Sequence, residues 1–93
     1  MPWHVYILRC ANGALYIGHT IDLQGRERYH NLGQGAHFTS QRRPVKLVYH
    51  ETFEVKQGAI SREKQLKRWS REKKEALIRG NFDTLKSASK RRP

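Results

Sequence analysis

Two short apolar runs near the start of the chain predict a pair of β-strands. They read Trp3-His4-Val5-Tyr6-Ile7-Leu8 and Leu15-Tyr16-Ile17-Gly18, and β-branched and aromatic side chains dominate both. The segment between them contains Asn12-Gly13, two residue types that tolerate the positive φ of a tight turn. The pattern therefore predicts a β-hairpin over residues 5–19.

The length of the hairpin loop decides which side chains share a face of the sheet. A two-residue loop would place Tyr6 and Tyr16 on opposite faces. A three-residue loop with Gly13 in the left-handed region would pair Cys10 with Ala14 and place both tyrosines on one face. Both registers are open, and only the second allows a site that uses both tyrosines.

Helical periodicity follows the hairpin. From Thr20 or Asp22, both acceptable N-caps, a helix can run to about Asn31. Arg26 and His30 are four residues apart and therefore share a face of this helix. A glycine inside the segment costs about 1 kcal/mol relative to alanine, so the helix depends on tertiary packing.

The second half of the chain predicts one strand and two helices. Residues 45–50 are β-branched and aromatic enough for a third strand, with Pro44 at its entrance. Residues 55–69 read as a helix. Ser70 can cap another helix that runs to Ile78 and ends at Gly80. The segment 32–35, between the first helix and the third strand, is predicted to be a loop.

Charge narrows the class of partner. The chain has 93 residues, enough for one domain with a modest core, and its 19 lysines and arginines against 8 acids give a net charge of +11. Such an excess attracts polyanions, so nucleic acid is the favoured partner. A basic ribosome-associated protein or one that binds anionic membranes would share this composition.

Cysteine usage and hydropathy bear on the compartment. The lone Cys10 cannot form an internal disulfide, and no Cys/His spacing offers four zinc ligands. The apolar run at residues 5–8 is far shorter than a signal peptide or a membrane span. We therefore expect a cytoplasmic protein, with association with the nucleoid compatible with its charge, and no membrane partner.

Glu63 is the acid whose position is most informative. Ala59, Glu63 and Leu66 fall at i, i+4 and i+7, the face that a helix buries against a sheet. Burying a carboxylate costs several kcal/mol unless it is paired or binds a cation, so an ion pair and a metal site are the two interpretations. Mg²⁺ often takes only one or two protein carboxylates, so one glutamate is enough.

Four other residues could serve phosphodiester chemistry. Arg26 could bind a phosphate with its bidentate fork, although most arginines on amphipathic helices are simply solvated. Tyr6 and Tyr16 could act as general bases if cations lowered their pKa, or they could be core residues. His30 could relay protons near neutral pH, or it could be a packing residue.

In combination these motifs resemble the GIY-YIG endonuclease superfamily. The first motif stands as His4-Val5-Tyr6 and the second as Tyr16-Ile17-Gly18, followed by a helix arginine, Arg26, and a helix glutamate, Glu63. The resemblance covers residues 5–78 and is strongest to the small, single-domain, largely uncharacterised bacterial-type members. His4 stands where glycine is usual, which removes no proposed catalytic group.

The resemblance implies a fold and a set of roles. The fold is α/β of the α+β type, a small central three-stranded antiparallel sheet flanked by helices, over residues 1–80. Residues 81–93 are expected to be a flexible basic tail. By likeness, Tyr6 or Tyr16 helps to activate water, Arg26 holds the phosphate, His30 assists proton transfer or contacts the phosphate, and Glu63 binds Mg²⁺ or Mn²⁺.

The expected activity is hydrolysis of DNA phosphodiester bonds. Many members of the superfamily carry an added sequence-reading module. We expect this chain to select DNA structure or to use a protein partner for specificity, in repair or recombination. The residues expected to bind nucleic acid are Arg42, Arg43, Lys64, Lys67 and Arg68.

Two other functions stay open. A non-catalytic nucleic-acid-binding module could keep this fold and use the basic helices, including Arg71, Lys73 and Lys74. A basic scaffold could instead bind a protein partner through Trp69 or Trp3. Persistence of binding at high salt would separate the scaffold from the phosphate-binding functions.

Overall fold

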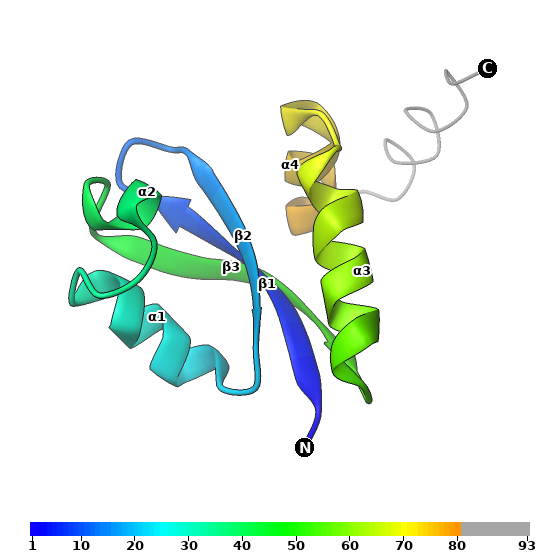
Figure 1. The fold of residues 1–93 in the computed structure, drawn as a ribbon. Coiled ribbons are helices and arrows are strands. Elements are labelled where there is room, and N and C mark those ends of the chain that lie inside the picture. The colour runs from blue at the N-terminus through cyan, green and yellow to red at the C-terminus, as the bar shows by residue number, and fades with distance from the viewer. Residues whose placement is uncertain (81–93) are drawn as a thin grey trace.

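The computed structural model describes residues 1–80, which form three strands and four helices (Figure 1). The predicted α+β fold, an antiparallel sheet flanked by helices, is confirmed. The tail predicted for residues 81–93 lies outside the described residues. The strands are β1 (Trp3–Cys10), β2 (Leu15–Thr20) and β3 (Val45–Phe53), and the helices are α1 (Leu23–Asn31), α2 (His37–Ser40), α3 (Lys56–Lys67) and α4 (Arg71–Arg79).

The sheet has the order β2-β1-β3, so β2 is an edge strand. Its hairpin with β1 has the three-residue loop: the Cys10 N–H donates to the carbonyl oxygen of Ala14 at 2.8 Å, and Gly13 has φ 88°. This register places Gly18 opposite Tyr6. Because side chains alternate along a strand, Tyr6 and Tyr16 lie on one face of the sheet, as the shared-site register requires.

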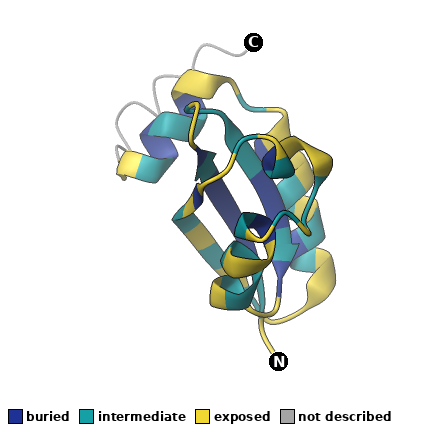
Figure 2. Cartoon of the chain, turned by 90° about the vertical axis from the view of Figure 1, so that its left-hand side faces the viewer, coloured by how far each residue is buried: buried dark blue, intermediate teal, exposed yellow. Residues whose placement is uncertain are grey.

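Each face of the sheet has its own core. Val5, Ile7 and Ile17 pack against α3 and α4 on one face, whereas Tyr6, Leu8 and Cys10 lie on the other face, toward α1. Figure 1 shows α1 and α3 on opposite sides of the sheet. Figure 2 shows that the buried residues follow the strands while the helices expose their outer surfaces. The helices therefore bring side chains to the sheet from two directions.

The helix caps agree with the sequence and explain the glycine inside α1. The Asp22 carboxylate caps α1 by accepting a hydrogen bond from the Gly25 N–H at 3.0 Å. A Cβ at position 25 would lie 2.2 Å from the same carboxylate, so glycine makes room for the cap. Ser70 caps α4, and Gly80 ends it in the left-handed region with φ 72°.

Two features go beyond the predicted elements. The third strand extends to Phe53 and contains a register shift opposite Ile7 and Leu8. The short helix α2 lies between the predicted loop and the third strand. Asn31 ties the end of α1 to the start of β3, because its side chain exchanges two hydrogen bonds with the backbone of Val45. None of the helices in residues 1–80 combines the length and apolar character that crossing a membrane requires.

Candidate active site

The five residues predicted to be catalytic line one cavity of about 350 Å³. The cavity lies along edge strand β2, between α1 on one side and α3 on the other (Figure 1). Its walls combine phenol, imidazole, guanidinium and carboxylate groups from β1, β2, α1 and α3. The complete lining is Tyr6, Tyr16, Gly18, His19, Arg26, Tyr29, His30, Gln34, Gly35, Ala36 and Glu63.

A chain of hydrogen bonds leads from the cavity into the protein. The Tyr6 hydroxyl lies 3.1 Å from His30 Nε2, and His30 Nδ1 lies 2.7 Å from Thr39 Oγ1. Thr39 donates its only hydroxyl proton to the carbonyl oxygen of Ala36 at 2.9 Å. Thr39 must then accept from Nδ1, which leaves Nε2 as the acceptor for the Tyr6 hydroxyl. The surroundings thus select the neutral Nδ1–H form of His30.

Burial keeps both Tyr6 and His30 neutral. The pKa of Tyr6 is raised, chiefly by burial and also by Tyr16 and Glu63, although Arg26 acts in the opposite direction. The pKa of His30 is lowered from its ordinary value, first by burial and then by the charge of Arg26. Tyr6 is therefore a phenol at neutral pH, hydrogen-bonded to an imidazole that can accept its proton.

Two glycines give this pair its space. A Cβ at Gly18 would lie 2.4 Å from the Tyr6 hydroxyl oxygen, and one at Gly35 would lie 2.2 Å from His30 Nδ1. Separations below 3.0 Å force something to move. The glycine of the second motif thus allows the tyrosine of the first motif to lie across β2.

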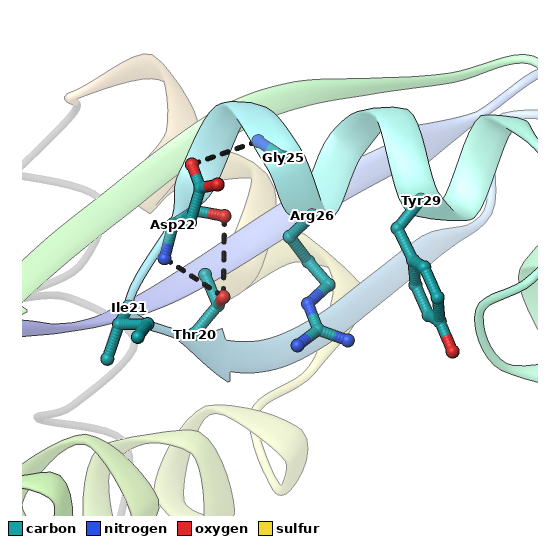
Figure 3. Close-up of a pocket in the computed structure, with 6 residues that line it drawn as sticks. All are labelled: Thr20, Ile21, Asp22, Gly25, Arg26 and Tyr29. Carbon is teal, nitrogen blue, oxygen red and sulfur yellow. Dashed lines mark hydrogen bonds between the residues drawn. The ribbon is translucent and has the colours of Figure 1, made fainter.

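Arg26 offers its guanidinium to the cavity. Within the described residues the Arg26 guanidinium forms no hydrogen bond or ion pair, and its only direct interaction is with the Tyr29 ring, whose centroid is 5.1 Å away. Both side chains project from the same side of α1 (Figure 3). An arginine whose donors are not engaged can accept an anionic ligand without first losing an ion pair.

Arg26 and Tyr29 also line a second hollow beside the cavity (Figure 3). It has a volume of about 400 Å³ and lies where β2 leads into α1. It extends the hollow surface beyond the catalytic residues toward Ile21, which is exposed. Its lining is Thr20, Ile21, Asp22, Gly25, Arg26 and Tyr29.

Glu63 reaches the cavity from α3 and is held by two nitrogen atoms. Its Oε1 lies 2.6 Å from His19 Nδ1 and its Oε2 lies 2.6 Å from Lys67 Nζ. Burial acts to raise the pKa of Glu63, but the hydrogen bonds from Lys67 and His19 outweigh burial and leave it below the ordinary value. The carboxylate is thus ionised and 15% exposed, and each of its oxygens contacts one nitrogen.

These properties suit a divalent cation. Glu63 supplies one anionic oxygen ligand, and the adjoining cavity has room for the water and phosphate oxygens with which Mg²⁺ completes its coordination. No group of three or more histidine, cysteine or acidic side chains within residues 1–80 could hold a metal. The donor set therefore fits a metal held by a single carboxylate and does not fit a closed protein cage.

The five residues expected to bind nucleic acid lie in three different places. Lys67 borders the cavity through its ion pair with Glu63, whereas Lys64 and Arg68 line a separate hollow beside Trp69. Arg42 donates to the carbonyl oxygen of Phe38. Arg43 donates to the carbonyl oxygens of Ser40 and Asn31. Both arginines therefore donate hydrogen bonds to backbone carbonyls of α1 or α2, and the structure does not bring the five residues together.

Several residues of the site carry no pattern in the sequence. Thr39 is fully buried and orients His30, Gly35 leaves room for that ring, and Tyr29 and Phe38 are partly exposed aromatic residues near the cavity. Only the spacing of Tyr29 from Arg26, three residues along a helix, could have pointed to their contact. Trp3 and Trp69 both pack against the core, and each has a cation over its ring.

The chain belongs to the GIY-YIG family. Its sequence matches the GIY-YIG catalytic domain over residues 2–76, which include every residue of the cavity. Its similarity extends to small bacterial proteins. A UPF0213 protein of Bacillus pumilus is 49% identical over 75 residues, which are 81% of this chain and 76% of the relative. One from Staphylococcus aureus is 48% identical over 75 residues, covering 81% of this chain and 92% of the relative.

Two solution NMR structures share the fold. The UPF0213 protein BH0048 from Bacillus halodurans has a TM-score of 0.56 and 38% identity, with coverage of 91% of this chain and 94% of that one. The protein EF2693 from E. faecalis has a TM-score of 0.59 and 33% identity, with coverage of 86% and 85%. The family is one of nucleases, and family membership implies a nucleic acid substrate in general terms.

Proposed function

We propose that the protein is a divalent-metal-dependent endonuclease that hydrolyses DNA phosphodiester bonds. The observation that carries the proposal is the convergence of Tyr6, Tyr16, Arg26, His30 and Glu63, from four elements, on one cavity. Separately, each of these residues has an ordinary structural explanation. Together they supply a proton acceptor, a phosphate ligand and a cation ligand, which are the groups that hydrolysis of a phosphodiester uses.

In this mechanism Tyr6 passes on the proton of the attacking water. As its oxygen takes that proton, its own hydroxyl proton moves to His30 Nε2, 3.1 Å away. The hydroxide attacks phosphorus, the P–O bond to the leaving oxygen breaks, and the leaving oxygen takes a proton from solvent. The raised pKa of Tyr6 supports this relay over a preformed phenolate. The lowered pKa of His30 favours release of the proton to solvent. Tyr16 packs its ring 5.1 Å from that of His30.

Arg26 holds the scissile phosphate. Its planar fork can donate to two non-bridging oxygens and stabilise the charge that grows on them during attack. The absence of a competing ion pair for Arg26 within residues 1–80 supports this role. The neighbouring Tyr29 ring limits where the guanidinium can lie.

Glu63 would hold Mg²⁺ or Mn²⁺. When bound, the cation supplies Lewis-acid stabilisation of the phosphate and the leaving oxygen. His19 and Lys67 hold the carboxylate toward the cavity and keep it ionised. Because each nitrogen contacts one carboxylate oxygen, we expect at least one of them to move when a cation binds.

The charge of the chain bears on how it would bind DNA. A net charge of +11 supports salt-sensitive binding to DNA. In this proposal the protein selects DNA structure over sequence, alone or with a partner protein. We place this activity in the cytoplasm, in repair or recombination.

A cleavage assay tests the proposal. Duplex, flap and branched DNA would be incubated with Mg²⁺ or Mn²⁺ and the wild-type protein, Arg26→Ala or Glu63→Gln. Arg28→Ala is the matched control for Arg26, because it removes an exposed arginine from the same helix. Glu72→Gln, at an exposed position of α4, is the control for Glu63.

We expect metal-dependent cleavage by the wild type and both controls, and a loss of about 10²-fold or more in each site variant with binding retained. Salt-sensitive binding without cleavage of any substrate would overturn the proposal and favour the non-catalytic binding module. Binding that persists at high salt would favour the protein scaffold.

A further inference from the structure

A third hollow adjoins the catalytic cavity at the opposite end of β2 from the one in Figure 3. Its volume is about 230 Å³, and it shares Tyr16 with the cavity. Phe38 and Lys74 belong to neither of the other two hollows. The lining comes from β2, α2, α3 and α4: Leu15, Tyr16, Ile17, Phe38, Lys67 and Lys74.

The three hollows follow β2 in sequence. Thr20, at the end of β2, lines the hollow in Figure 3, Tyr16 and Gly18 line the cavity, and Leu15, at the start of β2, lines the third hollow. Six residues of strand span about 17 Å, the axial rise of about five nucleotides in one strand of B-DNA. Half of the backbone polar groups of an edge strand face away from the sheet. A polynucleotide strand can therefore lie along β2 through the cavity.

The two walls of the third hollow differ in chemistry. One wall is aromatic: Phe38 is 37% exposed, and its ring centroid lies 6.2 Å from that of Tyr16. The guanidinium of Arg42 lies 4.1 Å from the Phe38 centroid, which limits the motion of the ring. The aromatic wall is thus a preformed surface for packing against a flat, apolar group.

The other wall is cationic. Lys67 and Lys74 come from α3 and α4, and the ammonium group of Lys74 forms no hydrogen bond or ion pair with the other residues of 1–80. Lys67 is paired with Glu63, and its side chain is 53% exposed. An aromatic surface opposite two ammonium groups matches a nucleotide, which has a base with a π-face and an anionic phosphate.

We propose that this hollow is a nucleotide subsite, which binds one base against Phe38 and the adjacent phosphates through Lys67 and Lys74, on one side of the scissile phosphate. The subsite rests on the proposed function, because it takes its position from a phosphate held by Arg26. A nucleotide bound in this subsite requires the polynucleotide strand to run along β2. The contact is made to any base, since stacking on an aromatic ring does not read base edges.

The subsite can be tested by binding without cleavage. The probe is a fluorescein-labelled duplex with a single-stranded flap, measured by anisotropy in EDTA with the wild type, Phe38→Ala, Phe38→Leu and Lys74→Gln. Lys46→Gln is the matched control, because it removes an exposed lysine from β3 at the far edge of the sheet. Salt titrations accompany each affinity.

We expect Phe38→Ala to weaken binding roughly tenfold and Phe38→Leu to restore only part of the loss. Lys74→Gln should reduce the slope of log affinity against log salt by about 1. If Lys46→Gln weakens binding as much as Lys74→Gln, the proposed contact between Lys74 and a phosphate is overturned, because the loss of one positive charge would then explain both effects.

An abasic scan separates contact from structural damage. A single abasic site is moved along the probe, and wild type is compared with Phe38→Ala at each position. At one position the abasic site should weaken wild-type binding and have no further effect in Phe38→Ala, because the same contact has already been lost. Losses that multiply at every position would overturn the subsite.

Cleavage of the same probe with Mg²⁺ distinguishes failure of the subsite from failure of the nuclease. If the wild type cleaves the probe but no abasic position loses its effect in Phe38→Ala, the subsite is overturned and the proposed nuclease activity is retained. If one abasic position loses its effect in Phe38→Ala but the wild type does not cleave the probe, the path of the polynucleotide along β2 is supported and the nuclease activity is overturned.

Discussion

The hydrogen bond between Tyr6 and His30 defines the chemistry of the site at the scale of single residues. Its direction follows from Thr39, whose hydroxyl proton is committed to the backbone and which therefore accepts from the imidazole. Its geometry follows from Gly18 and Gly35, which leave room for the two rings. The proposed relay thus depends on residues that take no part in proton transfer.

Gly18→Ala should displace Tyr6 and slow cleavage. The added methyl group would lie 2.4 Å from the Tyr6 hydroxyl oxygen, so the Tyr6 side chain or the strand must shift, and we expect the bond to His30 to be disturbed. Overpacking of this kind costs about 1–3 kcal/mol in the free energy of unfolding. Urea unfolding and single-turnover cleavage measure the two effects. Gly25→Ala, whose methyl group would meet the Asp22 cap instead, should lose stability but retain more activity. An unchanged cleavage rate in Gly18→Ala would contradict the relay.

His30 should titrate below its ordinary value of 6.5, because burial and Arg26 both disfavour the imidazolium. Protonation is then less favourable in the folded state than in the unfolded state, so stability is lost as pH falls below the ordinary value. NMR of the imidazole protons measures the pKa. Arg26→Ala should raise it toward the ordinary value, whereas Arg28→Ala should not. A titration midpoint of His30 at or above 6.5 in the wild type would contradict the neutral, buried state assigned to this imidazole.

Glu63 should direct a paramagnetic cation to one end of the cavity. Mn²⁺ added in small amounts should broaden the NMR signals of Glu63 and His19 first, since their side chains are in direct contact. Glu63→Gln should abolish this selective broadening, and Glu72→Gln should preserve it. Broadening that begins elsewhere in the wild type would place the metal outside the cavity.

At the scale of the elements, α4 is attached to the hairpin by charged side chains. The Glu75 carboxylate accepts hydrogen bonds from Arg9 at 2.7 and 2.8 Å and from Arg71 at 3.0 Å. Arg71 also donates to the Gly13 carbonyl oxygen at 2.6 Å. This attachment sets the position of Lys74 relative to β2, so it supports one wall of the third hollow.

Stability should fall in acid through Glu75. The hydrogen bonds from Arg9 lower the pKa of Glu75 to about 2, with burial opposing and Arg71 assisting. A lowered carboxyl pKa contributes stability above the ordinary value of 4.5 and loses it as pH falls toward 2. Glu75→Gln should cost about 1 kcal/mol near neutral pH and almost nothing near pH 2, by urea unfolding.

Glu72→Gln, at an exposed position of the same helix, is the control for this measurement. A constant difference between Glu75→Gln and wild type down to pH 2 would contradict the assignment of the shifted pKa to Glu75.

The elements were largely predictable, because each has a local cause. The apolar runs predicted the strands, Asp22 and Ser70 predicted two helix starts, and the Asn12-Gly13 turn left two registers, of which the structure has one. Helix α2 was not predicted, because four residues are too few to show a period. The extension of β3 also escaped prediction, since its later residues are mostly polar.

The site was predictable only in part. Motif spacing pointed to five residues that the fold does bring to one cavity, and their roles stay predictions. The partners of those residues could not be predicted, since Thr39 meets His30 and His19 meets Glu63 only through tertiary packing. Arg42 and Arg43 show the converse, because charge alone does not reveal that an arginine donates to the backbone of a neighbouring helix.

At the scale of the whole molecule, the site exists because helices on both sides of the sheet meet around an edge strand. α1 brings Arg26 and His30 from one side, and α3 brings Glu63 from the other (Figure 1). A central strand would keep these groups apart, because its neighbours would fill the space between the layers. A net charge of +11 favours binding to polyanions in general, and in the proposed complex the polynucleotide strand follows β2.

The central claim is that Arg26 and Glu63, which lie on different elements, act on one phosphate. The most direct measurement is the single-turnover cleavage rate, with Mg²⁺ and saturating enzyme, of wild type, Arg26→Ala, Glu63→Gln and the double variant. Groups that stabilise one transition state are non-additive, so the double variant should lose about as much as the more damaging single change. Losses that multiply, or single variants that cleave at the wild-type rate, would contradict the claim.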